Sequence, residues 1–243
     1  MPHALDGRAA VVTGGSRGIG RATVHTLAAA GAPVVVNWVR DEKAAHRTVD
    51  EVVAAGGRAV AVRADVAREA DVRRLFDEAE AAFGQPGIVV ANAAVVVTRP
   101  LTASTEADFD RVFGTNAKGV FLTLREAAAR IADGGRIVAV STVGTRLFLP
   151  NTPLYLGSKG AVEQFVRSLS RELGPRGITV NAVSPGFTET ALMPDEDRAW
   201  ASALSSFGRT GEPEEVARVI AYLAGPAAGW VTGQNISACG GVA

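Results

Sequence analysis

Cysteine, net charge and long apolar runs are scarce in this chain. Cys239 is the single cysteine of 243 residues, so an internal disulfide is excluded and the residue is expected to pack in the tail. Lysine plus arginine and aspartate plus glutamate each number 25, and no long run of like charge occurs. A chain without a basic or acidic excess is a poor partner for nucleic acid or a charged membrane surface.

Apolar segments are too short for a membrane span. None reaches the roughly 18 consecutive residues that a transmembrane helix requires, and the first residues lack the cationic start and apolar stretch of a signal peptide. We therefore expect a cytoplasmic protein without membrane partners. The apolar content of 47% is enough for one sizeable core, so residues 1–243 are expected to form a single domain.

Short β-branched runs alternate with longer stretches rich in alanine, leucine, glutamate and arginine. Because the runs are too apolar for strands with one wet face, they predict a buried parallel sheet. The predicted strands are 9–13, 33–38, 59–63, 88–91, 136–141, 178–183 and 234–237, and the predicted helices are 18–30, 41–55, 70–83, 105–132, 153–173 and 213–223. This order predicts an α/β fold of the Rossmann type, a doubly wound parallel sheet of about seven strands with helices on both faces.

The regular alternation breaks down in residues 191–210. The segment mixes polar residues with Leu192, Met193, Trp200, Leu204 and Phe207. Segments of this kind often cover binding sites, so we expect it to fold over a substrate with some hydrophobic surface. Further candidates for the pocket wall are Val95, Val96, Leu147, Phe148 and Leu154, although each could equally be core packing.

A glycine-rich loop joins the first predicted strand to the first predicted helix. Its sequence is Thr13-Gly14-Gly15-Ser16-Arg17-Gly18-Ile19-Gly20. Glycines allow a sharp turn and a close approach to phosphate, and a helix amino terminus offers free N–H donors. A glycine triplet alone could be a plain turn, but strand, glycines and helix in this order predict that Gly14, Ser16, Arg17, Gly18, Ile19 and Gly20 bind a dinucleotide pyrophosphate.

The end of the second predicted strand bears on the choice of dinucleotide. An acidic residue there would bind the adenosine ribose hydroxyls and repel the 2′-phosphate of NADP, but this chain has Asn37 and Trp38. Arg17 and Arg40 could bind that phosphate with paired hydrogen bonds, or could be solvated surface charges. We predict NADP(H) in preference to NAD(H), and Asp41 keeps NAD(H) open if the strand ends later.

Tyr155 and Lys159 lie one turn apart on a predicted helix, so they share a face. Reduction of a carbonyl needs a proton donor, and a nearby ammonium favours the phenolate that the reverse reaction needs. The alternative is an exposed surface pair. Only two tyrosines and three lysines occur in the chain, which favours a functional pair.

The glycine spacing and the Tyr155–Lys159 pair resemble the short-chain dehydrogenase/reductase family, with 3-oxoacyl carrier-protein reductases and glucose dehydrogenase-like enzymes as similar members. The resemblance implies an oxidoreductase that moves a hydride between nicotinamide and a carbonyl or alcohol carbon of a small molecule. It implies Tyr155 as proton donor or base, and Lys159 as the residue that lowers the pKa of Tyr155 and holds the nicotinamide ribose.

Two further catalytic positions follow from the resemblance. Thr142 stands where the family usually has a serine that binds the substrate oxygen, and it is preferred to Ser141 because alternate strand residues face opposite sides. Asn116 matches an asparagine that distorts a long central helix and helps to hold a water linked to the lysine.

The remaining cofactor contacts are implied in the same way. They are Asp65, Val66, Asn92, Ala93, Pro185, Gly186, Thr188 and Thr190. Ala91 and Ala94 replace an asparagine and a glycine of the family pattern. These departures and Thr142 motivate the alternative of a catalytically weak NADP(H)-binding sensor or scaffold, whereas Tyr155 with Lys159 favours an enzyme. A homotetramer or homodimer is expected, and no metal.

Overall fold

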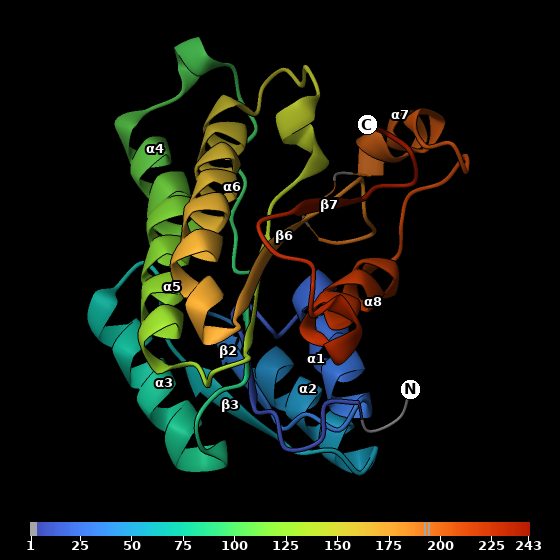
Figure 1. Ribbon diagram of the computed structural model, residues 1–243. Coiled ribbons are helices and arrows are strands. Elements are labelled where there is room, and N and C mark those ends of the chain that lie inside the picture. The colour runs from blue at the N-terminus through green and yellow to red at the C-terminus, as the bar shows by residue number, and fades with distance from the viewer. Residues whose placement is uncertain (1–3, 192, 194) are drawn as a thin grey trace.

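The computed structural model describes residues 4–191, 193 and 195–243 (Figure 1). Within them, seven parallel strands form one sheet in the order β3-β2-β1-β4-β5-β6-β7. The strands are β1 (Ala10–Val12), β2 (Val34–Trp38), β3 (Ala59–Arg63), β4 (Ile88–Ala91), β5 (Arg136–Val140), β6 (Thr179–Pro185) and β7 (Asn235–Ala238). The predicted doubly wound α/β fold is confirmed.

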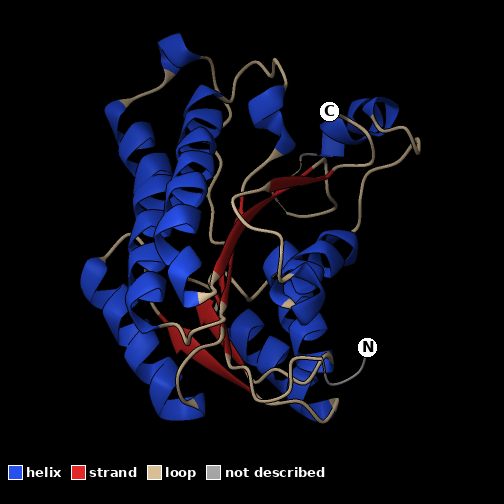
Figure 2. Cartoon of the chain, in the orientation of Figure 1, coloured by secondary structure: helices blue, strands red, loops and turns tan. Residues whose placement is uncertain are grey.

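Helices cover both faces of this sheet (Figures 1 and 2). They are α1 (Gly18–Ala29), α2 (Glu42–Ala54), α3 (Glu69–Phe83), α4 (Glu106–Phe113), α5 (Gly119–Arg130), α6 (Pro153–Leu173), α7 (Arg198–Leu204) and α8 (Pro213–Ala224). One face carries α1, α2 and α8, and the other carries α3, α5 and α6. None of the helices described is long and apolar enough to cross a membrane.

The core is divided by the alternation of side chains along each strand. In β1, Ala10 and Val12 pack toward the α1 and α8 side, whereas Val11 packs toward α3. In β5, Val138 packs on the side of the sheet that α1 and α8 cover, and Ile137 packs on the opposite side, with α5 and α6. Because both faces are buried, the central strands β1 and β4 read as continuous apolar runs, which is the pattern that predicted a parallel sheet.

The helix predicted over 105–132 is not one regular helix, and the distortion that the family resemblance implied at Asn116 is present. It is divided by η2 (Gly114–Lys118), a π-helical segment between α4 and α5, and it ends at Arg130 because Ile131 is extended, with ψ of 143°. The wider turn at η2 contains Asn116, whose side chain bonds to the backbone of Val95 rather than pointing to solvent. Helix-period sequence reasoning cannot detect such an insertion, since the apolar pattern continues on both sides.

The order of the strands determines where a site can form. The chain runs from β1 to β2 and β3 on one side, then returns to β4 on the other side of β1. At such a switch point the connections after β1 and β4 diverge, which leaves a crevice beyond the carboxyl ends of the strands. The predicted site residues follow these strand ends.

Candidate active site

One cleft of about 910 Å³ lies beyond the carboxyl ends of the strands. It is lined by every residue that the sequence assigned to catalysis or cofactor binding except Asn116. These are Gly14, Ser16, Arg17, Gly18, Ile19, Gly20, Asn37, Trp38, Arg40, Asp65, Val66, Asn92, Ala93, Thr142, Tyr155, Lys159, Pro185, Gly186, Thr188 and Thr190. Segments that are far apart in the sequence therefore meet in one place.

Two glycines of the glycine loop, Gly14 and Gly20, have no room for a side chain. Gly14 has φ of +64°, and a Cβ atom there would lie 3.0 Å from the Cα of Ala93. A Cβ at Gly20 would lie 2.1 Å from the carbonyl oxygen of Gly14, which no shift of a side chain could relieve. The amino terminus of α1 is therefore packed directly against the loop that precedes it.

The start of α1 has the features of an anion site. Arg17 occupies the N-cap position and, among the residues described, no side chain caps the helix there or adds an acidic group to its first turn. Unsatisfied N–H groups and the positive end of the helix dipole favour a negatively charged group at this point.

Two asparagines brace the loop. Asn37, only 2% exposed, accepts a hydrogen bond from Gly14 N at 3.2 Å and donates from Nδ2 to the Ala64 oxygen at 2.9 Å. Asn92 Nδ2 donates to the Thr13 oxygen at 2.9 Å. Both amides are thus bonded to the protein backbone, and each side chain borders the cleft as a support for its wall.

Sequence reasoning missed Thr13 as part of this support. Its hydroxyl oxygen accepts hydrogen bonds from the backbone N–H groups of Asn92 and Ala93, at 2.9 and 3.1 Å. It thereby joins the end of β1 to the segment after β4. A buried threonine at the end of an apolar strand, immediately before a glycine loop, was the available signal.

Arginine and aspartate side chains gather around the glycine loop and the ends of β2 and β3. Arg17 and Arg40 are exposed at the cleft, and the guanidinium of Arg63 lies 5.6 Å from the ring centre of Trp38. Asp41 caps α2 by accepting from Ala44 N at 2.9 Å. Asp65 accepts from Ala67 N at 3.0 Å, so its carboxylate shapes the turn after β3.

Tyr155, near the start of α6, lines the cleft together with Thr142, which follows β5. Burial raises the pKa of Tyr155 to about 12, and the hydrogen bond from Thr142 acts in the opposite direction. Thr142 Oγ1 also accepts from Gly144 N at 3.2 Å. Ser141 also lines the cleft, but its hydroxyl donates to Glu163 at 2.9 Å, whereas Thr142 is the neighbour that lowers the pKa of Tyr155.

Lys159 is almost completely buried beneath this pair. Its Nζ donates to the Val140 oxygen at 2.6 Å and lies 5.9 Å from the ring centre of Tyr155. Burial lowers the pKa of Lys159 to about 8. The two shifts run in opposite directions for one reason: in each residue the uncharged form is favoured where water is excluded.

Asn116 stands behind the cleft instead of lining it. Its Oδ1 accepts from Val95 N at 2.8 Å, and its Nδ2 donates to the Val95 oxygen at 2.8 Å and to Ser158 Oγ at 3.1 Å. The amide thus joins the segment after β4 to α6 next to Tyr155. Its implied part in catalysis stays a prediction.

The apolar wall of the cleft differs in part from the predicted one. Val95 and Val96 line the cleft, but Leu147, Phe148 and Leu154 do not. Phe148, which follows the η3 turn (Val143–Arg146), is fully exposed, and Leu154, in α6, is buried in the protein. The wall also contains Met193 and Trp200, from the segment predicted to cover the substrate, and the unpredicted Leu149, Leu156 and Phe187.

The loop after β6 closes the other side of the cleft. A Cβ at Gly186 would lie 2.8 Å from the Cα of Cys239, so this glycine allows the C-terminal tail to pack against the loop. Thr188 Oγ1 donates to the Gly186 oxygen at 3.0 Å. Cys239, partly exposed here, lies in the tail as expected.

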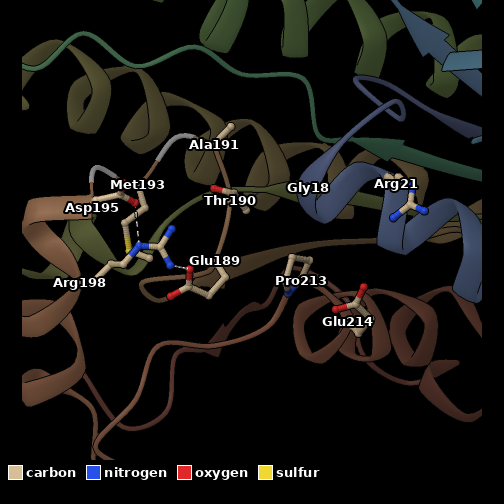
Figure 3. Close-up of a pocket in the computed structure, with 10 residues that line it drawn as sticks. All are labelled: Gly18, Arg21, Glu189, Thr190, Ala191, Met193, Asp195, Arg198, Pro213 and Glu214. Atoms are coloured by element: carbon tan, nitrogen blue, oxygen red, sulfur yellow. Dashed lines mark hydrogen bonds and ion pairs between the residues drawn. The ribbon is translucent and has the colours of Figure 1, made fainter. Parts of the chain in front are cut away.

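A smaller, open cavity of about 630 Å³ adjoins the cleft and shares Gly18 and Thr190 with it (Figure 3). In this view Arg198 points toward Glu189 and Asp195. Arg198 forms ion pairs with both carboxylates, the one with Asp195 at 3.0 Å. These pairs join the start of α7 to the loop after β6. Leu192, predicted as part of the apolar cover, lies outside the described residues.

Comparison with known proteins finds similarity along the whole chain. A family model described as enoyl-(acyl carrier protein) reductase matches residues 14–243. The short-chain dehydrogenase claC of Passalora fulva is 41% identical, with 100% of this chain and 97% of the relative covered. The hydroxynaphthalene reductase-like protein Arp2 of Metarhizium brunneum is 42% identical, with 99% of this chain and 96% of the relative covered.

Solved structures share both the fold and the sequence. A short-chain dehydrogenase/reductase from Serratia marcescens has a TM-score of 0.95 at 38% identity, covering 99% of each chain. The angucycline C-6 ketoreductase LanV, solved with bound NADP, has a TM-score of 0.95 at 39% identity, covering 100% of this chain and 98% of LanV. This chain therefore belongs to the short-chain dehydrogenase/reductase family and is an oxidoreductase that acts on C=O and CH–OH groups.

Proposed function

We propose that the protein is an NADP(H)-dependent reductase of small ketones, able to run in reverse as an alcohol dehydrogenase. The observation that carries the proposal is the placement of Thr142 and Tyr155 in one cleft, with the buried Nζ of Lys159 5.9 Å from the ring centre of Tyr155. Such an arrangement presents two hydroxyl groups to one substrate oxygen and controls the proton of one of them.

The cleft fits a dinucleotide. The crowded glycines and the start of α1 suit a pyrophosphate, and the cleft extends from there to Tyr155. Gly14, Ser16, Gly18 and Ile19 would hold the phosphates, Asp65 and Val66 the adenine, and Asn92, Ala93 and the loop residues Pro185, Gly186, Thr188 and Thr190 the nicotinamide half. When bound, the cofactor supplies or accepts a hydride.

Tyr155, Thr142 and Lys159 would together supply the proton and stabilise the negative charge that develops on the substrate oxygen. A tyrosine whose pKa is raised to about 12 is protonated at neutral pH, so Tyr155 is ready to donate to an oxygen that gains negative charge. Once a carbonyl is bound, the single proton of the Thr142 hydroxyl is donated to that oxygen instead of to Tyr155. For alcohol oxidation Tyr155 must lose its proton first, and the ammonium of Lys159 favours the phenolate.

The charges around the end of β2 support NADP(H) over NAD(H). The strand ends at Trp38, so no carboxylate occupies its last position, and Asp41 is used as the cap of α2. Arg17 and Arg40 are exposed on the two sides of this end of the cleft. Similar proteins have been solved with NADP, among them LanV and a short-chain dehydrogenase from Burkholderia cenocepacia.

Replacing Arg17 or Arg40 by alanine should weaken the binding of NADPH much more than the binding of NADH. Each guanidinium that binds the 2′-phosphate contributes about 1.5–3 kcal/mol, so the Kd for NADPH should rise about 10- to 100-fold. Fluorescence titration with both nucleotides measures the change. Arg47→Ala, on the exposed face of α2 and outside the cleft, is the control. Equal losses for NADPH and NADH would mean that neither arginine binds the 2′-phosphate.

We further propose that residues 191–210 cover the substrate and that the substrate carries hydrophobic surface. Met193 and Trp200 of this segment line the cleft, and the ring of Trp200 packs edge-on against Phe187 at 5.1 Å. Leu149 and Leu156 face the same space. Apolar walls of this kind suit ketones with aromatic or aliphatic bodies, in keeping with the aromatic compounds in the names of Arp2 and LanV.

A substrate panel tests the proposed function. Ketones, aldehydes and acyl thioesters of graded hydrophobicity are supplied with NADPH, and the nicotinamide absorbance is followed. We expect turnover with apolar ketones and a smaller rate with NADH. Failure of every carbonyl compound, in a protein that binds NADPH, would favour the alternative of a sensor or scaffold.

The chain should act as a homotetramer or homodimer in the cytoplasm. Phe109 and Phe121, on α4 and α5, are each 45% exposed, and helix faces of this kind commonly pack against a second copy. Light scattering measures the mass directly.

A further inference from the structure

Glu163 is a charged residue of α6 that has no place in the mechanism described so far. It follows Lys159 by one helical turn and Tyr155 by two, so the three side chains share one side of the helix. Glu163 does not line the cleft. Its carboxylate accepts hydrogen bonds from Ser141 Oγ at 2.9 Å and from Thr145 Oγ1 at 2.7 Å, both on Oε1.

The two hydroxyls lie on either side of Thr142. Ser141, only 2% exposed, is the first residue after β5, and Thr145 is in the η3 turn. Thr145 Oγ1 is also 3.0 Å from the backbone carbonyl oxygen of Thr142, but a hydroxyl has only one proton to donate. The charged and closer acceptor, Glu163, should receive it.

Lys159 adds a third attachment through its bond to the Val140 oxygen. Helix α6 therefore holds residues 140, 141 and 145 with two side chains, and Thr142 lies between these points. Within that turn the Gly144 N–H occupies one lone pair of Thr142 Oγ1. The orientation of the hydroxyl toward Tyr155 thus depends on the shape of the turn.

We propose that Glu163 is a positioning residue, which fixes the turn of residues 141–145 on α6 so that the Thr142 hydroxyl stays directed at the oxygen of Tyr155. The inference rests on the proposed function of Thr142 and Tyr155. Glu163 itself touches neither substrate nor cofactor. It links the strand end that carries one hydroxyl to the helix that carries the other.

The acceptor geometry makes the inference testable by graded substitution. Both donors share one oxygen, so Glu163→Gln retains an acceptor for them, whereas Glu163→Leu removes both bonds. We expect E163Q to keep kcat within a few-fold, and E163L to lose up to about 100-fold, the size of loss that a misplacement of about 1 Å can cause. The Kd for NADPH should change little in either variant.

Two readouts separate positioning from a purely structural effect. The hydrogen bond from Thr142 lowers the pKa of Tyr155. If E163L loses this bond, the pKa of Tyr155 should rise, and the pH at which the rate of alcohol oxidation increases should rise with it. In a double-mutant cycle, E163L should add little once Thr142→Val has removed the hydroxyl. Full additivity of the two losses, or an unshifted pH profile, would overturn the inference.

Controls keep folding and function apart. Glu172→Leu is matched, because Glu172 lies on α6 and accepts from Ser168 at 3.0 Å on the outer surface; its kcat should be unchanged. If E163L does not fold, Thr145→Val removes one donor only and should shift kcat and the pH profile in the same direction, and a wild-type profile there would also overturn the inference. A wild-type protein that reduces no carbonyl would refute the proposed function, whereas an active enzyme with an unaffected E163L would refute Glu163 alone.

Discussion

Tyr155→Phe should lose about 10²- to 10⁴-fold in kcat for carbonyl reduction, the usual contribution of a general acid. The substitution removes one oxygen and leaves the ring, which borders the cleft, and the helix in place. Since the substitution leaves the glycine loop and the start of α1 unchanged, the Kd for NADPH should be nearly unchanged. Steady-state kinetics and nucleotide titration measure the two quantities separately.

The chain provides a matched control for this experiment. Tyr222, on α8, is the only other tyrosine and is 50% exposed. Tyr222→Phe removes the same atom far from the cleft and should leave kcat unchanged. Turnover by Tyr155→Phe at the wild-type rate would mean that the proton comes from another group, and the proposed mechanism would fail.

The features that could be predicted from the sequence are those encoded locally. Continuous apolar strands, the glycine loop and the i,i+4 spacing of Tyr155 and Lys159 each reflect a requirement of the adjacent backbone. Periodicity also predicted that Thr142 and Ser141 would face opposite sides. In the structure the Ser141 hydroxyl bonds to Glu163, and Thr142 is the neighbour that lowers the pKa of Tyr155.

Other features depend on contacts between distant segments. The amide of Asn37 bonds to Gly14 and Ala64, which only the assembled sheet brings together. Leu149 replaces Leu147 in the cleft wall because a short turn after β5 redirects the chain, and no pattern marks that change of direction. The π-helical segment around Asn116 was implied by the family resemblance but not by periodicity, since its amide bonds to Val95, which lies 21 residues earlier.

Lys159→Met should lower kcat by about 10²- to 10³-fold, because a charge that stabilises the developing phenolate is lost. It should also change how stability depends on pH. Burial lowers the pKa of Lys159 from 10.5 to about 8. Between these pH values the unfolded chain keeps the proton and the folded chain releases it, so the free energy of unfolding should rise with pH across this window.

The rise should amount to about 3 kcal/mol in the wild type and be absent in Lys159→Met, because each pKa unit corresponds to about 1.4 kcal/mol. The Met variant also leaves the Val140 oxygen without its Nζ donor, but that cost does not vary with pH and cancels in the slope. Tyr155, whose pKa is raised to about 12, makes stability fall above pH 10 in both proteins. Denaturant unfolding at pH 7.5 and 10 measures the difference, with the exposed Lys43→Met as control. Parallel pH curves for wild type and Lys159→Met would mean that folding does not lower the pKa of Lys159, and the stability prediction would fail.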